Sequence, residues 1–120
     1  MAALLAERFA AVVPSAISVA AQSCFVDVAG SRIDTAFHVK HSEFAGARTV
    51  CDVAVMAMEV AADAVAEATR DPWPAAPGQF PGGFASCHAE IVAESVRLWF
   101  GAPTAPILEL EPMPIHDVLA

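Results

Sequence analysis

The segment 45–70, AGARTVCDVAVMAMEVAADAVAEATR, constrains the fold most, because it is the one long stretch with unbroken helical periodicity. At about 100° per residue, its charged side chains gather in one stripe. That stripe contains Asp52, Glu59, Asp63 and Arg70, with Met56 and Glu67 at its margin. The opposite side carries Val50, Ala54, Ala57, Ala61, Ala64 and Ala68, flanked by Val53, Met58, Val60 and Val65. We therefore predict an amphipathic helix with an acidic stripe and an apolar face.

The alanines of this helix make the centre of its apolar face nearly flat, so another backbone can approach closely. Packing on a sheet within the chain is the favoured interpretation, and helix–helix dimerisation through the alanine seam is the alternative. Ser42 is a candidate N-cap with Glu43 in the first turn. Arg70 falls in the expected last turn, and Asp71-Pro72 ends the helix because proline lacks an N–H.

Shorter elements flank the long helix on both sides. Residues 2–12 predict a short helix, and a period of two begins at Ile17. Strands are expected at 17–21, 24–28 and 32–40 before the long helix, and at 87–92, 96–100 and 107–113 after it. The order α-βββ-α-βββ predicts an α+β fold, a two-layer sandwich whose single antiparallel sheet is covered by the long helix. The two halves follow the same order, which suggests an ancient duplication.

Composition limits the class of protein. The chain has 120 residues and a net charge of −8, which suits a single small domain, 1–120, and argues against nucleic acid and anionic membranes as partners. Its three cysteines form no CxxC pair, which favours reduced thiols and a cytoplasmic location. The N-terminal segment lacks the basic start of a signal peptide, and no stretch is long and apolar enough for a membrane span.

Aromatic side chains mark two candidate interaction surfaces. Residues 71–84 form a Pro/Gly-rich loop within the domain and carry Trp73, Phe80 and Phe84. This loop either docks into a partner or folds back over the sheet, and we favour folding back because exposed aromatic rings are an aggregation liability. Trp99 and the neighbouring Arg97 alternate with Val96, Leu98 and Phe100. Either the sheet is covered on both faces, or Trp99 contacts a partner.

Histidine and cysteine side chains are the candidates for metal binding or nucleophilic chemistry. They are His38, His41, Cys87 and His88. Residues one or three apart on a strand face opposite sides, so neither pair converges on a metal without help from elsewhere. We expect surface histidines near strand ends, with a metal site that uses these residues as the alternative. We assign no catalytic residue, metal or cofactor.

Carboxylate pairs and motif searches add little. Glu90/Glu94 and Glu109/Glu111 fit a solvated strand face better than a glycosidase pair. The sequence contains no GxSxG, HExxH or phosphate-binding glycine loop.

Three C-terminal segments, EATRDPWP (67–74), RLWFG (97–101) and LELEPMPI (108–115), carry a resemblance. They resemble a group of small uncharacterised actinobacterial proteins with an EATxxPWP, LWFG and EPxPI pattern. The resemblance covers roughly the C-terminal half and implies the same small α+β fold in a cytoplasmic protein. The function of that group is unknown, so the resemblance assigns no functional residue. A looser likeness, in element order and charge alone, connects the chain to small acidic secretion chaperones that dimerise.

The sequence thus favours a non-enzymatic protein–protein interaction module, a small acidic adaptor, chaperone-like or assembly subunit. We expect its partner to be another protein or a second copy, most simply in a dimer. The first alternative is a metal-binding protein or enzyme that uses Cys87 and His88 with His38 and His41. The second is a small-molecule binder with a pocket between the long helix, the sheet and the 71–84 loop.

Overall fold

The computed structural model describes residues 1–22, 25–35, 43–71, 73–74, 86–102 and 104–119. Its elements in chain order are α1 (Ala2–Ala10), β1 (Val19–Gln22), β2 (Phe25–Val28), β3 (Ser31–Asp34), α2 (Glu43–Thr69), β4 (Cys87–Val92), β5 (Ser95–Ala102), β6 (Ala105–Pro114) and α3 (Ile115–Leu119). The α+β class is confirmed, and the elements follow the expected order with α3 added at the end.

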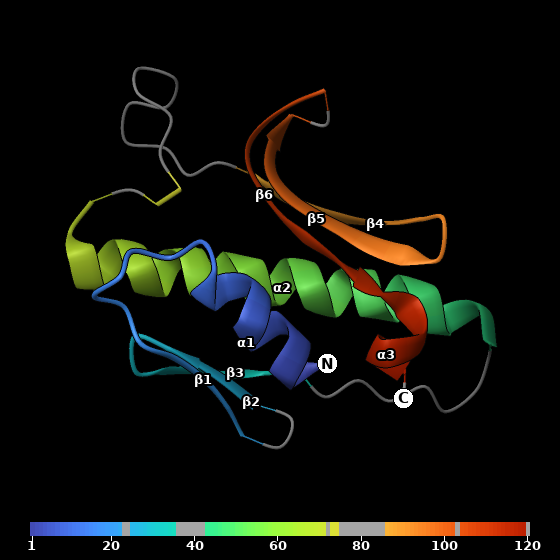
Figure 1. Cartoon of the computed structure of the whole chain (residues 1–120), viewed down its shortest axis with the longest axis horizontal. Helices are drawn as coiled ribbons and strands as arrows, with labels where there is room; N and C mark the ends of the chain where they lie inside the picture. Colours follow the sequence, from blue (N-terminus) through green and yellow to red (C-terminus); the bar gives the residue numbers. More distant parts are fainter. Residues whose placement is uncertain (23–24, 36–42, 72, 75–85, 103, 120) are drawn as a thin grey trace.

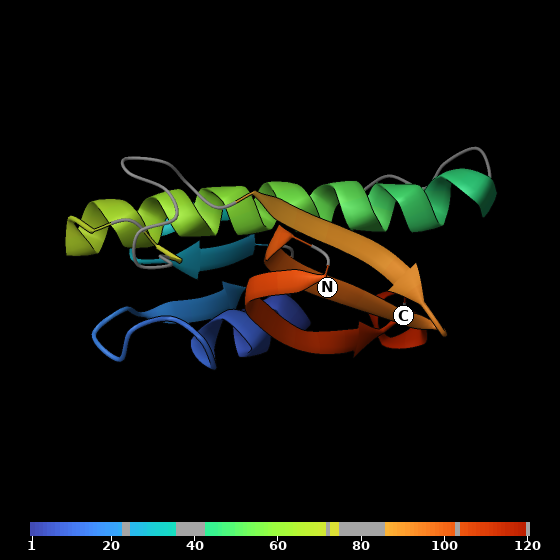
Figure 2. The same ribbon diagram turned by 90° about the horizontal axis from the view of Figure 1, so that it is seen from above.

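The strands form two sheets, which corrects the prediction of one. Among the described residues, β1-β2-β3 and β4-β5-β6 are separate three-stranded antiparallel sheets. In Figure 1 they lie on opposite sides of α2, and Figure 2 shows α2 running along both. The helix reaches both sheets because its 27 residues extend over about 40 Å. It packs against β2 and β3 of the first sheet and against β4 and β5 of the second.

The apolar face of α2 accounts for this arrangement. Its buried side chains are Val50, Ala54, Ala57, Met58, Ala61, Ala62, Ala64 and Val65. On the helical wheel these residues span an arc of about 160°, with Ala62 at one edge and Ala64 at the other. This buried face is wide enough to contact two sheets. The acidic stripe is exposed, as predicted. The helix ends at Thr69, so Arg70 is not in its last turn as we expected. Arg70 follows the helix in a left-handed conformation (φ 59°).

Two tight hairpin turns set the strand registers. Ala29-Gly30 joins β2 to β3, and Ala93-Glu94 joins β4 to β5. All four residues have positive φ values, between 48° and 85°, as two-residue turns of type I′ require. The sequence places both reversals but makes each turn a residue too long. The strand expected at 32–40 is β3 up to Asp34, and residues 36–40 lie outside the described part.

The short helices pack on the sheets: α1 contacts β1, β2 and β6, and α3 contacts β6. Leu5 and Phe9 of α1 are fully buried. The Arg8 guanidinium donates hydrogen bonds to the backbone oxygens of Glu111 (2.9 Å) and Pro112 (3.1 Å), which ties α1 to β6. The second sheet has β6 at its edge, as the prolines of that strand predict. None of the described helices has the length and apolar character needed to cross a membrane.

Candidate functional site

The sheet β4-β5-β6 has an inner face toward the core and an outer face directed away from it. Val96, Leu98 and Phe100 of β5 point inward and are fully buried. Strand alternation therefore places Arg97 and Trp99 on the other side, where the register sets His88 and Glu109 on either side of Trp99. We use the name outer face for His88, Glu90, Val92, Arg97, Trp99 and Glu109.

Trp99 lies at the centre of the outer face, and two flat groups contact its ring. The His88 ring stacks on the indole, with centroids 5.2 Å apart and 24° between the planes. The Arg97 guanidinium lies 4.3 Å from the centroid of the indole ring. Such a cation–π contact contributes about 0.5–2 kcal/mol, depending on how far it is desolvated. Only 3% of Trp99 is exposed, so it is buried although it points away from the core.

Arg97 is held over the indole by carboxylates from both neighbouring strands. Its Nε donates to Oε1 of Glu109 at 2.6 Å, and its Nη1 lies 3.8 Å from Oε1 of Glu90. The Glu90 and Glu109 side chains are 53% and 43% exposed, so each carboxylate stays accessible to solvent while it positions Arg97. The carboxylates belong to a solvated strand face, as the sequence indicates.

The indole N–H of Trp99 has no hydrogen-bond partner. Among the residues that the structure describes, Nε1 of Trp99 is the one side-chain nitrogen or oxygen atom that is buried and makes no hydrogen bond. A buried donor left without an acceptor costs about 1–3 kcal/mol, because it has lost its bond to water and gained nothing in return. The outer face therefore contains a donor that the folded chain does not satisfy.

Cys87 and His88 do not form a joint site. Cys87 points toward α2, where its thiol donates to the Val55 carbonyl oxygen at 3.5 Å, and His88 lies on the outer face. Burial, with a smaller contribution from the nearby Glu59 carboxylate, raises the pKa of Cys87 to about 11. The thiol is therefore protonated near neutral pH, and the thiolate is the form that acts as a nucleophile or metal ligand. Within the described residues, no group of three or more His, Cys, Asp and Glu side chains is arranged to hold a metal ion.

The other predicted site residues fall into two groups. Trp73 is half-buried and meets the core residue Phe100 edge-on, with ring centroids 5.7 Å apart at 68°, so the start of the 71–84 loop folds back against the inner face of the sheet and not over its open face. Phe80, Phe84, His38 and His41 lie outside the described residues.

Sequence reasoning selected Arg97 and Trp99 but missed what surrounds them. The sequence left open whether the sheet is covered on both faces or Trp99 contacts a partner, and the structure shows Trp99 buried within the chain. The stacking of His88 on Trp99 depends on the register between β4 and β5, which the sequence does not specify to the residue. The alternation within HAEIV was the available signal, since it already placed His88, Glu90 and Val92 on one face.

Comparisons with known proteins identify no relative: no protein-family model matches the chain, and no curated protein or solved structure matches it significantly.

Proposed function

We propose that this chain is a non-enzymatic protein–protein interaction module, a small acidic adaptor or assembly subunit, and that it binds its partner on the outer face of the sheet β4-β5-β6. The observation that carries the proposal is the buried Trp99 indole whose N–H lacks an acceptor. The unpaired donor raises the free energy of the free chain. A partner that supplies a carbonyl or carboxylate oxygen to this N–H removes the penalty, and this gain contributes to the binding free energy.

Binding at Trp99 requires a small rearrangement. The Nε1 atom is buried, so an acceptor reaches it only after groups around the indole move, and His88 and Arg97 are two side chains in contact with that ring. His88 is the easier group to displace, since it is only partly buried and its Nε2 is held by a hydrogen bond with the Ser86 hydroxyl at 3.2 Å, whereas Arg97 is held by two carboxylates. Tryptophan and arginine are also the residues that most often dominate binding energy at interfaces.

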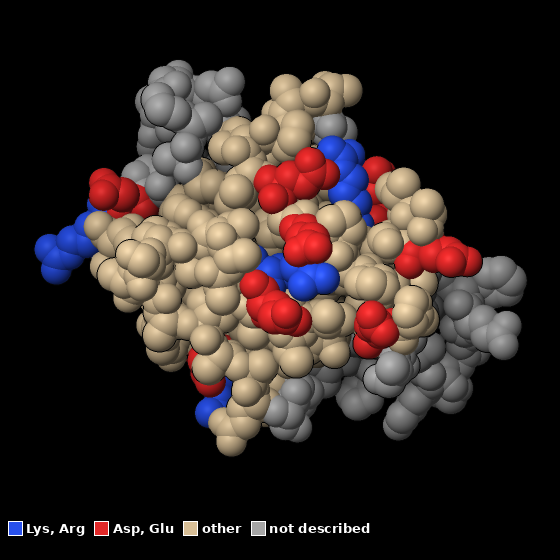
Figure 3. All heavy atoms as spheres, viewed as in Figure 1, with Lys and Arg blue, Asp and Glu red and all other residues tan. Residues whose placement is uncertain are grey.

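The charge of the outer face indicates the partner's chemistry. Glu90 and Glu109 present accessible carboxylates there, and Val92 at the end of β4 is 48% exposed. The face of the molecule shown in Figure 3 likewise carries more acidic than basic side chains. A second copy would bring the same carboxylates and the same net charge of −8. We therefore favour a different protein, through a segment that combines lysine or arginine with apolar side chains, over a homodimer.

A pair of designed peptides tests this proposal. Both are twelve residues long with the same apolar residues, and one carries lysine where the other carries glutamate. The full chain should bind the basic peptide more tightly in fluorescence anisotropy, with affinity falling as salt is added. Val92→Ser and Glu90→Gln should each weaken binding several-fold. The matched control is Met56→Ser, because Met56 is also exposed (36%) but lies on α2.

Three outcomes would count against the outer face as a site for a basic partner. The first is equal binding of the acidic and basic peptides. The second is an equal loss of affinity in the Met56→Ser and Val92→Ser variants. The third is a homodimer in sedimentation velocity that Val92→Ser dissociates, since the partner would then be a second copy.

A further inference from the structure

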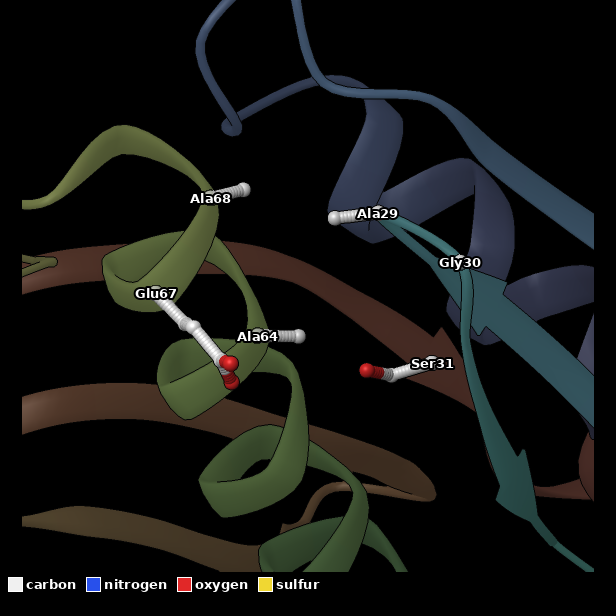
Figure 4. Close-up of a pocket in the computed structure, with 6 residues that line it drawn as sticks. All are labelled: Ala29, Gly30, Ser31, Ala64, Glu67 and Ala68. Atoms are coloured by element: carbon white, nitrogen blue, oxygen red, sulfur yellow. The ribbon is translucent and has the colours of Figure 1, made fainter.

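A pocket lies between the C-terminal part of α2 and the turn that joins β2 to β3, far from the outer face. Its volume is about 320 Å³, and it is lined by Ala29, Gly30, Ser31, Ala64, Glu67 and Ala68. The three alanines contribute methyl groups from both walls (Figure 4). The Glu67 carboxylate and the Ser31 hydroxyl point toward each other across the space between those walls.

The polar groups of this pocket all favour a cation. Glu67 is its charged lining residue, and the Ser31 oxygen can accept a hydrogen bond. Ala64, Glu67 and Ala68 belong to the last turns of α2, which ends at Thr69, and the C-terminal end of a helix carries partial negative charge. Among the lining residues that the structure describes there is no Lys or Arg; Arg70 follows the end of the helix but does not line the pocket. The electrostatic potential and the acceptors therefore suit a positively charged ligand.

The side chains that line the pocket indicate which kind of cation would fit. Methyl groups on both sides favour a ligand with an aliphatic body, and the carboxylate and hydroxyl favour a head group with several N–H donors. We propose that this pocket binds a primary ammonium group on a short unbranched aliphatic chain, with the ammonium between Glu67 and Ser31 and the chain against Ala29, Ala64 and Ala68. This ligand is either a free alkylamine or the side chain of a lysine.

NMR titration of the full chain tests the proposal, with n-butylammonium as the probe and n-butanol as its neutral counterpart of equal size. Butylammonium should shift the backbone amide signals of Gly30, Ser31 and Ala68 and saturate at millimolar concentration, as expected for so small a ligand. Butanol should bind less tightly. A lysine blocked at both its amino and carboxyl ends serves as a second probe. Binding of this probe assigns the site to a lysine side chain, and its exclusion assigns it to a free amine; both results support an ammonium site.

Variants separate the pocket from general attraction to an acidic surface. Glu67→Gln should weaken butylammonium binding by about 1.4- to 5-fold, the range for an ion pair open to solvent. Ala68→Leu should abolish the shifts by filling the pocket, and it should fold normally because Ala68 is exposed. Asp52→Asn is the matched control, since it removes the same charge from the same helix about 22 Å away, well beyond the Debye length.

The proposal is overturned if butanol and butylammonium shift the same signals equally, or if the shifts persist in the Ala68→Leu variant. An equal effect of Asp52→Asn and Glu67→Gln would also overturn it, since binding would then follow net charge and not the pocket.

Discussion

The contact between Arg97 and Trp99 gives the account's most quantitative prediction. Replacing Arg97 with methionine keeps most of the aliphatic stem but removes the charge that lies 4.3 Å from the indole centroid. The lost cation–π contact contributes about 0.5–2 kcal/mol. The ion pairs with Glu109 and Glu90, both open to solvent, together add about 0.2–1 kcal/mol. The Arg97→Met variant should therefore lose about 0.7–3 kcal/mol of unfolding free energy.

A double-mutant cycle separates the two contributions. Urea unfolding of Arg97→Met, Trp99→Leu and the double variant should give a coupling free energy of about 1 kcal/mol between the two side chains. In 1 M sodium chloride the ion-pair part should fall, as Glu109→Gln will report independently, while the coupling to Trp99 should persist because the indole is 3% exposed. A coupling below about 0.3 kcal/mol, or one that high salt abolishes, would refute the stacked arrangement.

Three further predictions concern the core and the turns. The pKa of Cys87 is raised from 9.0 to about 11, so the folded chain holds this proton more tightly than the unfolded chain. Its stabilising effect is complete below pH 9 and lost as the pH rises toward 11; Cys87→Ala should weaken this decline in urea titrations across that range. Ala61→Leu should lower the unfolding free energy by about 1–3 kcal/mol by overfilling the flat face of α2, and thermal unfolding of this variant should show it. Gly101→Ala should be more destabilising than Gly30→Ala: both glycines have positive φ, but only at position 101 would the added Cβ lie 2.9 Å from a backbone atom, the nitrogen of Ile107. Equal unfolding free energies for the two glycine variants would contradict the close approach at Gly101.

Local patterns account for the elements that the sequence predicted correctly. The 3.6-residue period of α2 identified most of its buried face, because helical periodicity depends only on the chain itself. Two positions differ: Ala68, expected on that face, is exposed near the end of the helix, and Ala62, not expected there, is buried. The alternation of Val96, Leu98 and Phe100 predicted the inner face of β5 for the same reason. The prolines of β6 placed that strand at an edge, since proline cannot donate to a neighbouring strand.

The number of sheets could not be predicted in this way. It depends on whether the strands before α2 pair with the strands after it. The alternation of side chains along a strand is the same whether the strands form one sheet or two. The pocket at Glu67 was missed for a similar reason. It forms where the turn Ala29-Gly30 meets the end of α2, and no local pattern records that meeting. Whether Trp99 is buried could not be decided from the sequence, because the groups around it include His88 from another strand.

The most direct test of the central proposal is the ¹H–¹⁵N signal of the Trp99 indole, measured with and without the basic twelve-residue peptide. In the free chain this N–H should exchange slowly with solvent and yet show the upfield proton shift of a donor without an acceptor. The peptide should move the Trp99 signal downfield and leave the Trp73 indole signal in place, because Trp73 contacts Phe100 on the inner face. An unchanged Trp99 signal at saturating peptide, or a response confined to Trp73, would contradict docking on the outer face.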